Sequence, residues 1–132
     1  MIKSEAFYQE ISSFRLLVAT AEHYFQAMKF KDNKEYFEKI RLSALPSIAF
    51  KLGRTRDIKI CKDWESIKDD VMLQALRAKF AQHDNLKKLL LSTNKRLIIE
   101  HTKNDRYWAD GGDGSGKNIL GKLLMQVRSE LS

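Results

Sequence analysis

The sequence predicts a mainly α fold, an orthogonal helical bundle with minor β structure near the N-terminus. Apolar residues recur at helical spacing in most segments after residue 20, and residues that commonly cap helices precede several of these segments. The chain has 132 residues, of which 43% are apolar. A chain of this size can form one core, so we expect a single domain over residues 1–132.

The first helix follows a segment without helical periodicity. Apolar residues are irregularly spaced over residues 2–18, which favours short extended pieces. Thr20 then has the identity of an N-cap, and we expect the helix to end near Lys31. Its apolar face is formed by Ala21, Tyr24, Phe25 and Met28.

Three more helices are predicted before residue 82. Asn33 can cap the second helix, Pro46 suits the first turn of the third, and Gly53 suits the third helix's C-terminal end. Asp63 can cap the longest helix, roughly residues 64–81. The buried side of the second helix would hold Tyr36, Phe37 and Ile40, and that of the longest helix Ile67, Val71, Met72, Ala75, Leu76 and Phe80.

The remaining third of the chain combines helices with a long loop. Leucines at 86, 89 and 90 indicate another helix, and residues 97–100 favour a strand or a buried extended turn. Residues 104–117 are predicted to form a loop, because four of the six glycines lie there. A final helix over 118–131 would bury Ile119, Leu120, Leu123, Leu124, Val127 and Leu131.

Charge and cysteine content narrow the class of protein. A net charge of +7 favours anionic partners, although no recognised motif supports a non-enzymatic nucleic-acid-binding module. A single cysteine, Cys61, allows no internal disulfide and fits a reducing compartment. We see no secretory pattern, membrane span or local metal-ligand spacing, and we expect a cytoplasmic protein without metal or cofactor.

The glycine-rich loop resembles a phosphate-binding loop only in part. Gly111, Gly116 and Lys117 have the G-x-x-x-x-G-K spacing, but Asn118 stands where a nucleotide-binding P-loop needs Ser or Thr, so we reject an ATPase. Glycines before a helix still allow backbone N–H groups and Lys117 to approach a phosphate. The alternative is a flexible loop that is merely rich in glycine.

Two further groups of residues suggest chemistry. Glu22 lines up with Gln26 and Lys29, either as a solvated helix side or as a carboxylate facing a cleft for acid–base work. His23 is more typical of a partly buried helix residue than of a catalyst.

Aromatic residues accompany charges at two other places. Trp64 and Lys68 share a helix face, so they could stack a heterocycle and bind its phosphate, or form a core tryptophan with a solvent-reaching lysine. Asp105 and Trp108 place an acid and an aromatic in the loop, which favours a ligand site.

These pieces together resemble one family. Residues 22–30, EHYFQAMKF, are similar to the E-H-Y-x-Q-A-x-K-F signature of NADAR (YbiA-like) proteins. Gly53-Arg54 resembles the family's glycine–arginine step, and Asp63-Trp64 with Lys68 resembles its D-W-x-x-x-K helix. Residues 116–128, GKNILGKLLMQVR, are close to its G-x-N-x-L-G-x-x-L-M-x-x-R ending.

The resemblance implies a mainly α hydrolase of N-glycosidic bonds. Its expected partner is a small phosphorylated ribosyl substrate, a ribosylamino-pyrimidine phosphate of riboflavin biosynthesis. The alternatives are removal of ADP-ribose from guanine in nucleic acid and a catalytically weak nucleotide-binding protein. By matching position, the catalytic candidates are Glu22, Trp64 and Asp105, and the substrate-binding candidates are Arg54, Lys68, Trp108, Gly116, Lys117 and Asn118.

The sequence departs from the family pattern at three places. Ser13 stands where asparagine is usual, Ala109 where glycine is usual, and the segment between Phe14 and Glu22 is shorter than the pattern leads us to expect. These departures leave the chemistry in place and leave substrate choice open. Whether Glu22 acts as a base or as a nucleophile also stays open at this point.

Overall fold

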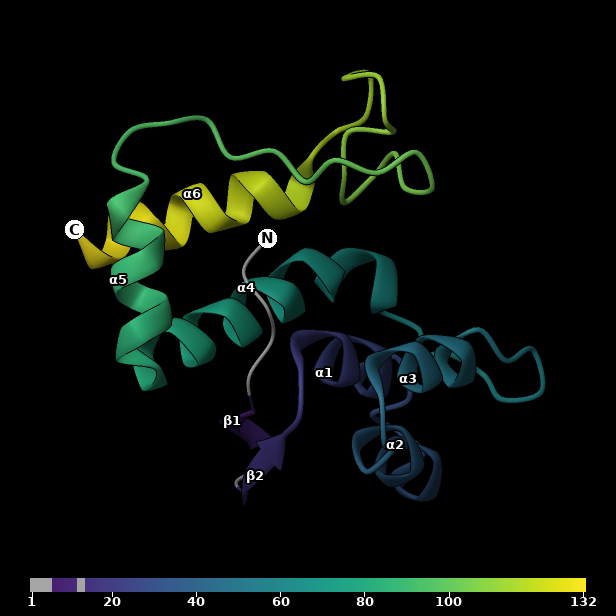
Figure 1. The fold of residues 1–132 in the computed structure, drawn as a ribbon. Helices are drawn as coiled ribbons and strands as arrows, with labels where there is room; N and C mark the ends of the chain where they lie inside the picture. Colours follow the sequence, from purple (N-terminus) through teal and green to yellow (C-terminus); the bar gives the residue numbers. More distant parts are fainter. Residues whose placement is uncertain (1–5, 12–13) are drawn as a thin grey trace. The chain divides into compact units, whose positions relative to one another are not determined.

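The computed structural model describes residues 6–11 and 14–132. In chain order the elements are β1 (Phe7–Ile11), β2 (Phe14–Val18), α1 (Ala21–Met28), α2 (Lys34–Arg41), α3 (Pro46–Gly53), α4 (Trp64–Gln82), α5 (Asp84–Ser92) and α6 (Ile119–Leu131) (Figure 1). The predicted mainly α fold with minor N-terminal β structure is confirmed. The described residues form two compact units, one up to Gln82 and one from His83 onward. The single domain stays a prediction.

The extended pieces predicted before residue 18 form an antiparallel hairpin. Phe7 pairs with Val18, and both side chains are buried. On the other side of β1 the amide of Gln82, the last residue of α4, bonds to the backbone of Tyr8. Its Nε2 donates to the Tyr8 carbonyl at 2.6 Å, and the Tyr8 N–H donates to its Oε1 at 2.8 Å. The predicted departure at Ser13 lies outside the described residues.

Helix α1 begins at the predicted cap. The Thr20 hydroxyl accepts the backbone N–H of His23 at 3.1 Å. The His23 ring is fully buried, with Nε2 3.0 Å from the Ser43 carbonyl and Nδ1 2.7 Å from the Thr20 hydroxyl. Because a carbonyl only accepts, Nε2 donates, and Nδ1 accepts the hydroxyl proton. His23 therefore joins α1 to the end of α2 as a structural residue.

The end of α1 differs from the prediction. The helix stops at Met28 rather than near Lys31, because the N–H groups of Phe30 and Lys31 bond three residues back and tighten the chain into turns. Asn33 then caps α2, as predicted, by accepting the N–H of Tyr36. Pro46 lies in the first turn of α3, as predicted.

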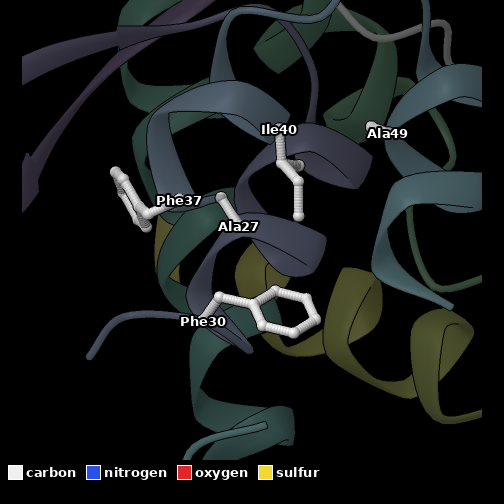
Figure 2. Packing of buried hydrophobic residues seen from close by; sticks show 5 residues of the cluster. All are labelled: Ala27, Phe30, Phe37, Ile40 and Ala49. Atoms are coloured by element: carbon white, nitrogen blue, oxygen red, sulfur yellow. The ribbon is translucent and has the colours of Figure 1, made fainter. Parts of the chain in front are cut away.

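The core of the N-terminal unit lies where α1, α2 and α3 meet. Figure 2 shows five of its buried side chains, which form one cluster: Ala27, Phe30, Phe37, Ile40 and Ala49. Two of the five are alanines, and small side chains let neighbouring helix backbones approach closely. Helix α4 packs against α1 and β1. Most of its predicted apolar stripe is buried: Val71, Met72, Ala75, Leu76 and Phe80.

In the C-terminal unit, α5 packs against α6, and the chain between them carries the glycine-rich loop (Figure 1). The strand or buried turn predicted at 97–100 is wrong. Leu97 is 70% exposed and Ile99 is 50% exposed, and the segment has no regular secondary structure. Its backbone bonds to a side chain, Asn118, instead of to a neighbouring strand. Within the described residues, no helix is long and apolar enough to cross a membrane.

Candidate active site

Glu22 lies in the first turn of α1 with a buried amide beside it. The Nε2 of Gln26, one turn later, donates to Glu22 Oε2 at 2.9 Å. Gln26 is only 3% exposed, and Glu22 and Lys29 are half-buried. The interpretation of this stripe as a solvated helix side is therefore wrong, because its middle member lies in the interior. The half-buried Glu22 carboxylate fits the other interpretation, a carboxylate available for acid–base work.

Gly53 makes room for this amide. A Cβ on Gly53 would lie 1.9 Å from Gln26 Oε1 and 2.6 Å from its Cδ. The sequence correctly predicted Gly53 at the end of α3, but the reason differs, because the following cap residue Arg54 has φ −93° and no left-handed residue ends this helix. Glycine is needed here because α1 and α3 approach closely at this point.

Charged groups of both signs surround Lys29. Its ammonium group lies 5.6 Å from the centre of the Phe25 ring and donates to the Gly53 carbonyl at 3.5 Å. Burial lowers the pKa of Lys29 below its usual value. The Glu22 carboxylate acts in the opposite direction, the Arg54 guanidinium lowers the pKa further, and weaker effects come from Glu65 and Lys68.

Trp64 joins the same group of residues through Phe25. The two rings meet edge to face with their centres 4.9 Å apart, and Trp64 is 6% exposed. Lys68, one turn further along α4, donates to Glu65 at 2.8 Å. The structure thus brings four of the predicted site residues together. We call this group the Glu22 cluster: Glu22, Gln26, Lys29, Arg54, Trp64 and Lys68.

The other predicted site residues lie in the loop before α6. Asp105 Oδ1 accepts the backbone N–H groups of Tyr107 at 2.9 Å and Trp108 at 2.8 Å. The Tyr107 and Trp108 rings meet edge to face, and the Lys117 ammonium lies 5.5 Å from the centre of the Tyr107 ring. Asp105 therefore orders the loop that presents the two rings and the lysine.

The backbone at the start of α6 does not match the predicted phosphate cradle. The N–H groups of residues 116–120 donate, in order, to the carbonyls of Asp110, Arg106, Ala109, Tyr107 and Trp108, at 2.7 to 3.0 Å. A Cβ on Gly116 would lie 2.4 Å from the Ala109 carbonyl oxygen. Gly116 therefore allows two stretches of backbone to cross, and its predicted approach to an anion stays a prediction. Lys117 keeps an exposed side chain.

Asn118 has a structural task that the sequence did not reveal. Its backbone is left-handed, with φ 52°. Its Nδ2 donates to the Ile98 carbonyl at 2.9 Å, and its Oδ1 accepts the Glu100 N–H at 2.9 Å. A Cβ on Gly121 would lie 2.3 Å from the same Ile98 carbonyl. The asparagine and glycine of the N-x-L-G motif together hold residues 98–100 against α6, and a contact of the Asn118 amide with substrate stays a prediction.

Asp110 was missed by sequence reasoning. It is 7% exposed, its Oδ1 accepts the N–H groups of Gly112 and Thr102, and its Oδ2 lies 2.8 Å from His101 Nδ1. The bond to His101 lowers the pKa of Asp110 and raises the pKa of His101. The signal in the sequence was an aspartate directly before two glycines, which favours a turn closed by the aspartate side chain. Three aspartates in one loop obscured it.

Similarity to known proteins extends along most of the chain. The family model described as "NADAR domain" matches residues 3–132. "N-glycosidase YbiA" of Escherichia coli strain K12 is 54% identical over 113 residues, covering 86% of this chain and 70% of that protein. "Riboflavin biosynthesis protein PYRR, chloroplastic" of Zea mays is 41% identical over 121 residues, covering 85% of this chain and 19% of that protein.

A solved structure, the NMR structure of the E. coli protein YbiA, has a TM-score of 0.82 and 49% identity, covering 96% of this chain and 73% of that one. The predicted enzyme class, a hydrolase of N-glycosyl bonds, is confirmed by the names of these relatives. The predicted resemblance is confirmed as well, and the chain belongs to the NADAR domain family.

Proposed function

We propose that this protein hydrolyses the ribosyl C–N bond of phosphorylated ribosylamino-pyrimidines, with Glu22 as its catalytic carboxylate. The observation that carries the proposal is the Glu22 cluster: a half-buried acid beside a buried amide, with Lys29 on the same helix face and Arg54 and Lys68 close to Lys29. Those cations, Lys29, Arg54 and Lys68, suit a phosphate-bearing substrate. Relatives from Zea mays and Vibrio vulnificus are named riboflavin biosynthesis proteins, which supports the pyrimidine class.

The chemistry needs a carboxylate at this position. Cleavage of a ribosyl C–N bond develops positive charge on the sugar, and a fixed negative charge stabilises it. Glu22 performs this role, or it removes a proton from the attacking water. Both roles require the ionised form of the carboxylate, to which the Gln26 amide donates its hydrogen bond.

The other predicted residues take supporting roles in the proposal. Trp64 belongs to the cluster and meets Phe25 edge to face, and stacking of a base on its ring stays a prediction. Asp105 uses Oδ1 to accept two N–H groups, and we propose that Oδ2 holds a ribose hydroxyl. Trp108 and Lys117 are proposed to contact the substrate. We also propose that residues 1–132 act as one NADAR domain, since the family match runs through both units.

Glu22→Gln tests the proposal directly. Glutamine keeps the shape and removes the charge, so turnover of a ribosylamino-pyrimidine phosphate should fall at least ~10²-fold while the circular dichroism spectrum is unchanged. Glu35→Gln is the matched control, because Glu35 occupies the same first-turn position in α2 and is exposed. Glu35→Gln should keep full turnover. Full turnover in Glu22→Gln would remove Glu22 from the mechanism.

A salt series separates the small substrate from a nucleic acid. If the enzyme acted on ADP-ribosylated DNA and neutralised three or four phosphates, the log–log slope of affinity against salt would be about −3, because counterions are released. A free mono- or diphosphate should give a much shallower slope. Cleavage of an ADP-ribosylated oligonucleotide that is steeply salt-dependent, with no cleavage of the free nucleotide, would replace the pyrimidine substrate with the nucleic acid.

A further inference from the structure

Gln26 is a polar side chain in the interior of the N-terminal unit, and its amide makes one hydrogen bond there. Its Nε2 donates to Glu22 Oε2 at 2.9 Å, and its Oε1 has no hydrogen-bond partner among the described residues. A buried amide oxygen without a partner is costly, and a methionine or leucine would fill the same space without that cost. Packing alone therefore does not explain a glutamine at this position, whereas the bond to Glu22 does.

The orientation of the amide follows from its partners. A carboxylate oxygen accepts, so the NH₂ end of Gln26 faces Glu22 and the oxygen faces Gly53. A side chain at Gly53 would overlap that oxygen, since its Cβ would lie 1.9 Å away. Lys29 Nζ reaches the carbonyl of the same glycine at 3.5 Å. Gly53 thus borders both polar residues that follow Glu22 on its helix face.

We propose that Gln26 is the positioning residue of the Glu22 carboxylate, and that position 53 is glycine so that the Gln26 amide can hold this place. The inference rests on the proposed function of Glu22. A buried donor that is fixed by packing on both sides selects one rotamer of the carboxylate and stabilises its charged form. Gln26 itself touches no reacting atom in this account and acts through Glu22.

The charged groups around Lys29 must also be held constant in any test. Lys29 follows on the same helix, Arg54 comes from the end of α3, and Glu65 and Lys68 come from α4. Two arginines on the other packed elements have partners elsewhere. On α2, Arg41 bonds to Glu38 and to the Leu17 carbonyl, and on β2, Arg15 lies over the Tyr8 ring.

The first test replaces the amide by a side chain of similar shape without a donor. In Gln26→Met, kcat for a ribosylamino-pyrimidine phosphate should fall about 10-fold with KM changed far less, because one charge-assisted hydrogen bond is lost. The acidic limb of the pH–rate profile should move to higher pH, because the carboxylate loses a hydrogen bond to its charged form. Gln74→Met is the matched control, because Gln74 donates to Asp70 at the same i, i+4 spacing on the exposed side of α4. It should leave kcat and the profile unchanged.

The second test uses Gly53. The Cβ of Gly53→Ala would meet the movable amide of Gln26 at 1.9 Å and the Gln26 Cβ at 3.1 Å. The fold can therefore accept it only by displacing the amide from Glu22 and by a small shift of the two helices. Gly53→Ala should therefore lower kcat about as much as Gln26→Ala does. When both changes are combined, the loss should equal that of Gln26→Ala alone, because a residue that acts only through Gln26 has nothing left to act on.

The outcomes separate this inference from the proposed function. If Glu22→Gln is inactive but the acidic limb of the pH–rate profile does not move in Gln26→Met, the positioning role of Gln26 is overturned. The proposed catalytic role of Glu22 then still stands. If the fold-losses of kcat from Gly53→Ala and Gln26→Ala multiply in the double variant, the proposed role of Gly53 is overturned. An active Glu22→Gln would overturn both the proposed function and this inference. Melting temperatures of all variants show whether a loss of kcat comes from unfolding, and a pH limb that moves in a fully folded Gln26→Met supports the inference.

Discussion

Asn118→Gly tests the bridge between α6 and residues 98–100. Glycine accepts the left-handed backbone at φ 52° without strain, so the substitution removes only the side chain and its two hydrogen bonds to the Ile98 carbonyl and the Glu100 N–H. Each such bond contributes about 0.5–1.5 kcal/mol. We therefore expect the free energy of unfolding to fall by about 2 kcal/mol, and the melting temperature by roughly 7 °C for a chain of this size.

Asn94→Gly is the control for the backbone. Asn94 also has a left-handed backbone, with φ 53°, but its side chain is exposed. Its replacement should change the free energy of unfolding by less than ~0.5 kcal/mol. Both variants are followed by circular dichroism through guanidinium and thermal unfolding. Equal losses in the two variants would refute the bridge, because the shared backbone conformation and not the Asn118 amide would then determine stability.

Two further predictions concern the histidines. His23→Ala should lower the free energy of unfolding by about 3 kcal/mol in the same denaturation assay, because it leaves a cavity and an unpaired Ser43 carbonyl, and a loss below ~1 kcal/mol would contradict the buried network. The His101–Asp110 pair should make stability depend on pH in two windows. Because the pKa of His101 is raised, its contribution to the free energy of unfolding is complete below pH 6.5 and is lost as pH rises above that value. Because the pKa of Asp110 is lowered, its contribution is complete above pH 3.8 and is lost as pH falls below that value. Melting temperatures of His101→Gln across this range should lack the loss above pH 6.5, and an unchanged profile would show that the pair contributes nothing.

Features that depend on a few neighbouring residues were predictable from the sequence. The caps at Thr20 and Asn33 and the proline in the first turn of α3 are such features, because each is decided by residues within one helical turn. The apolar stripe of α4 is another, because periodicity alone identifies the buried face.

Features that depend on distant contacts were not predictable. Gln26 is a polar residue that the sequence alone would place at the surface. It is buried where the end of α3, at Gly53, approaches α1. Residues 97–100 have the composition of a strand, but their backbone partner is the side chain of Asn118. The resemblance to a family identified both Gln26 and Asn118 as motif positions without revealing what either does.

The Gln82 amide at the edge of the hairpin bears on how molecules of this protein behave when crowded. A two-stranded sheet exposes rows of backbone donors and acceptors to which a strand of another molecule can add. The side-chain amide of Gln82 has the same donor and acceptor as a peptide group, and it occupies both backbone groups of Tyr8, near the start of β1. It therefore ends the sheet at that point as a third strand would, and a second molecule would have to displace α4's last residue before it could begin an intermolecular sheet there.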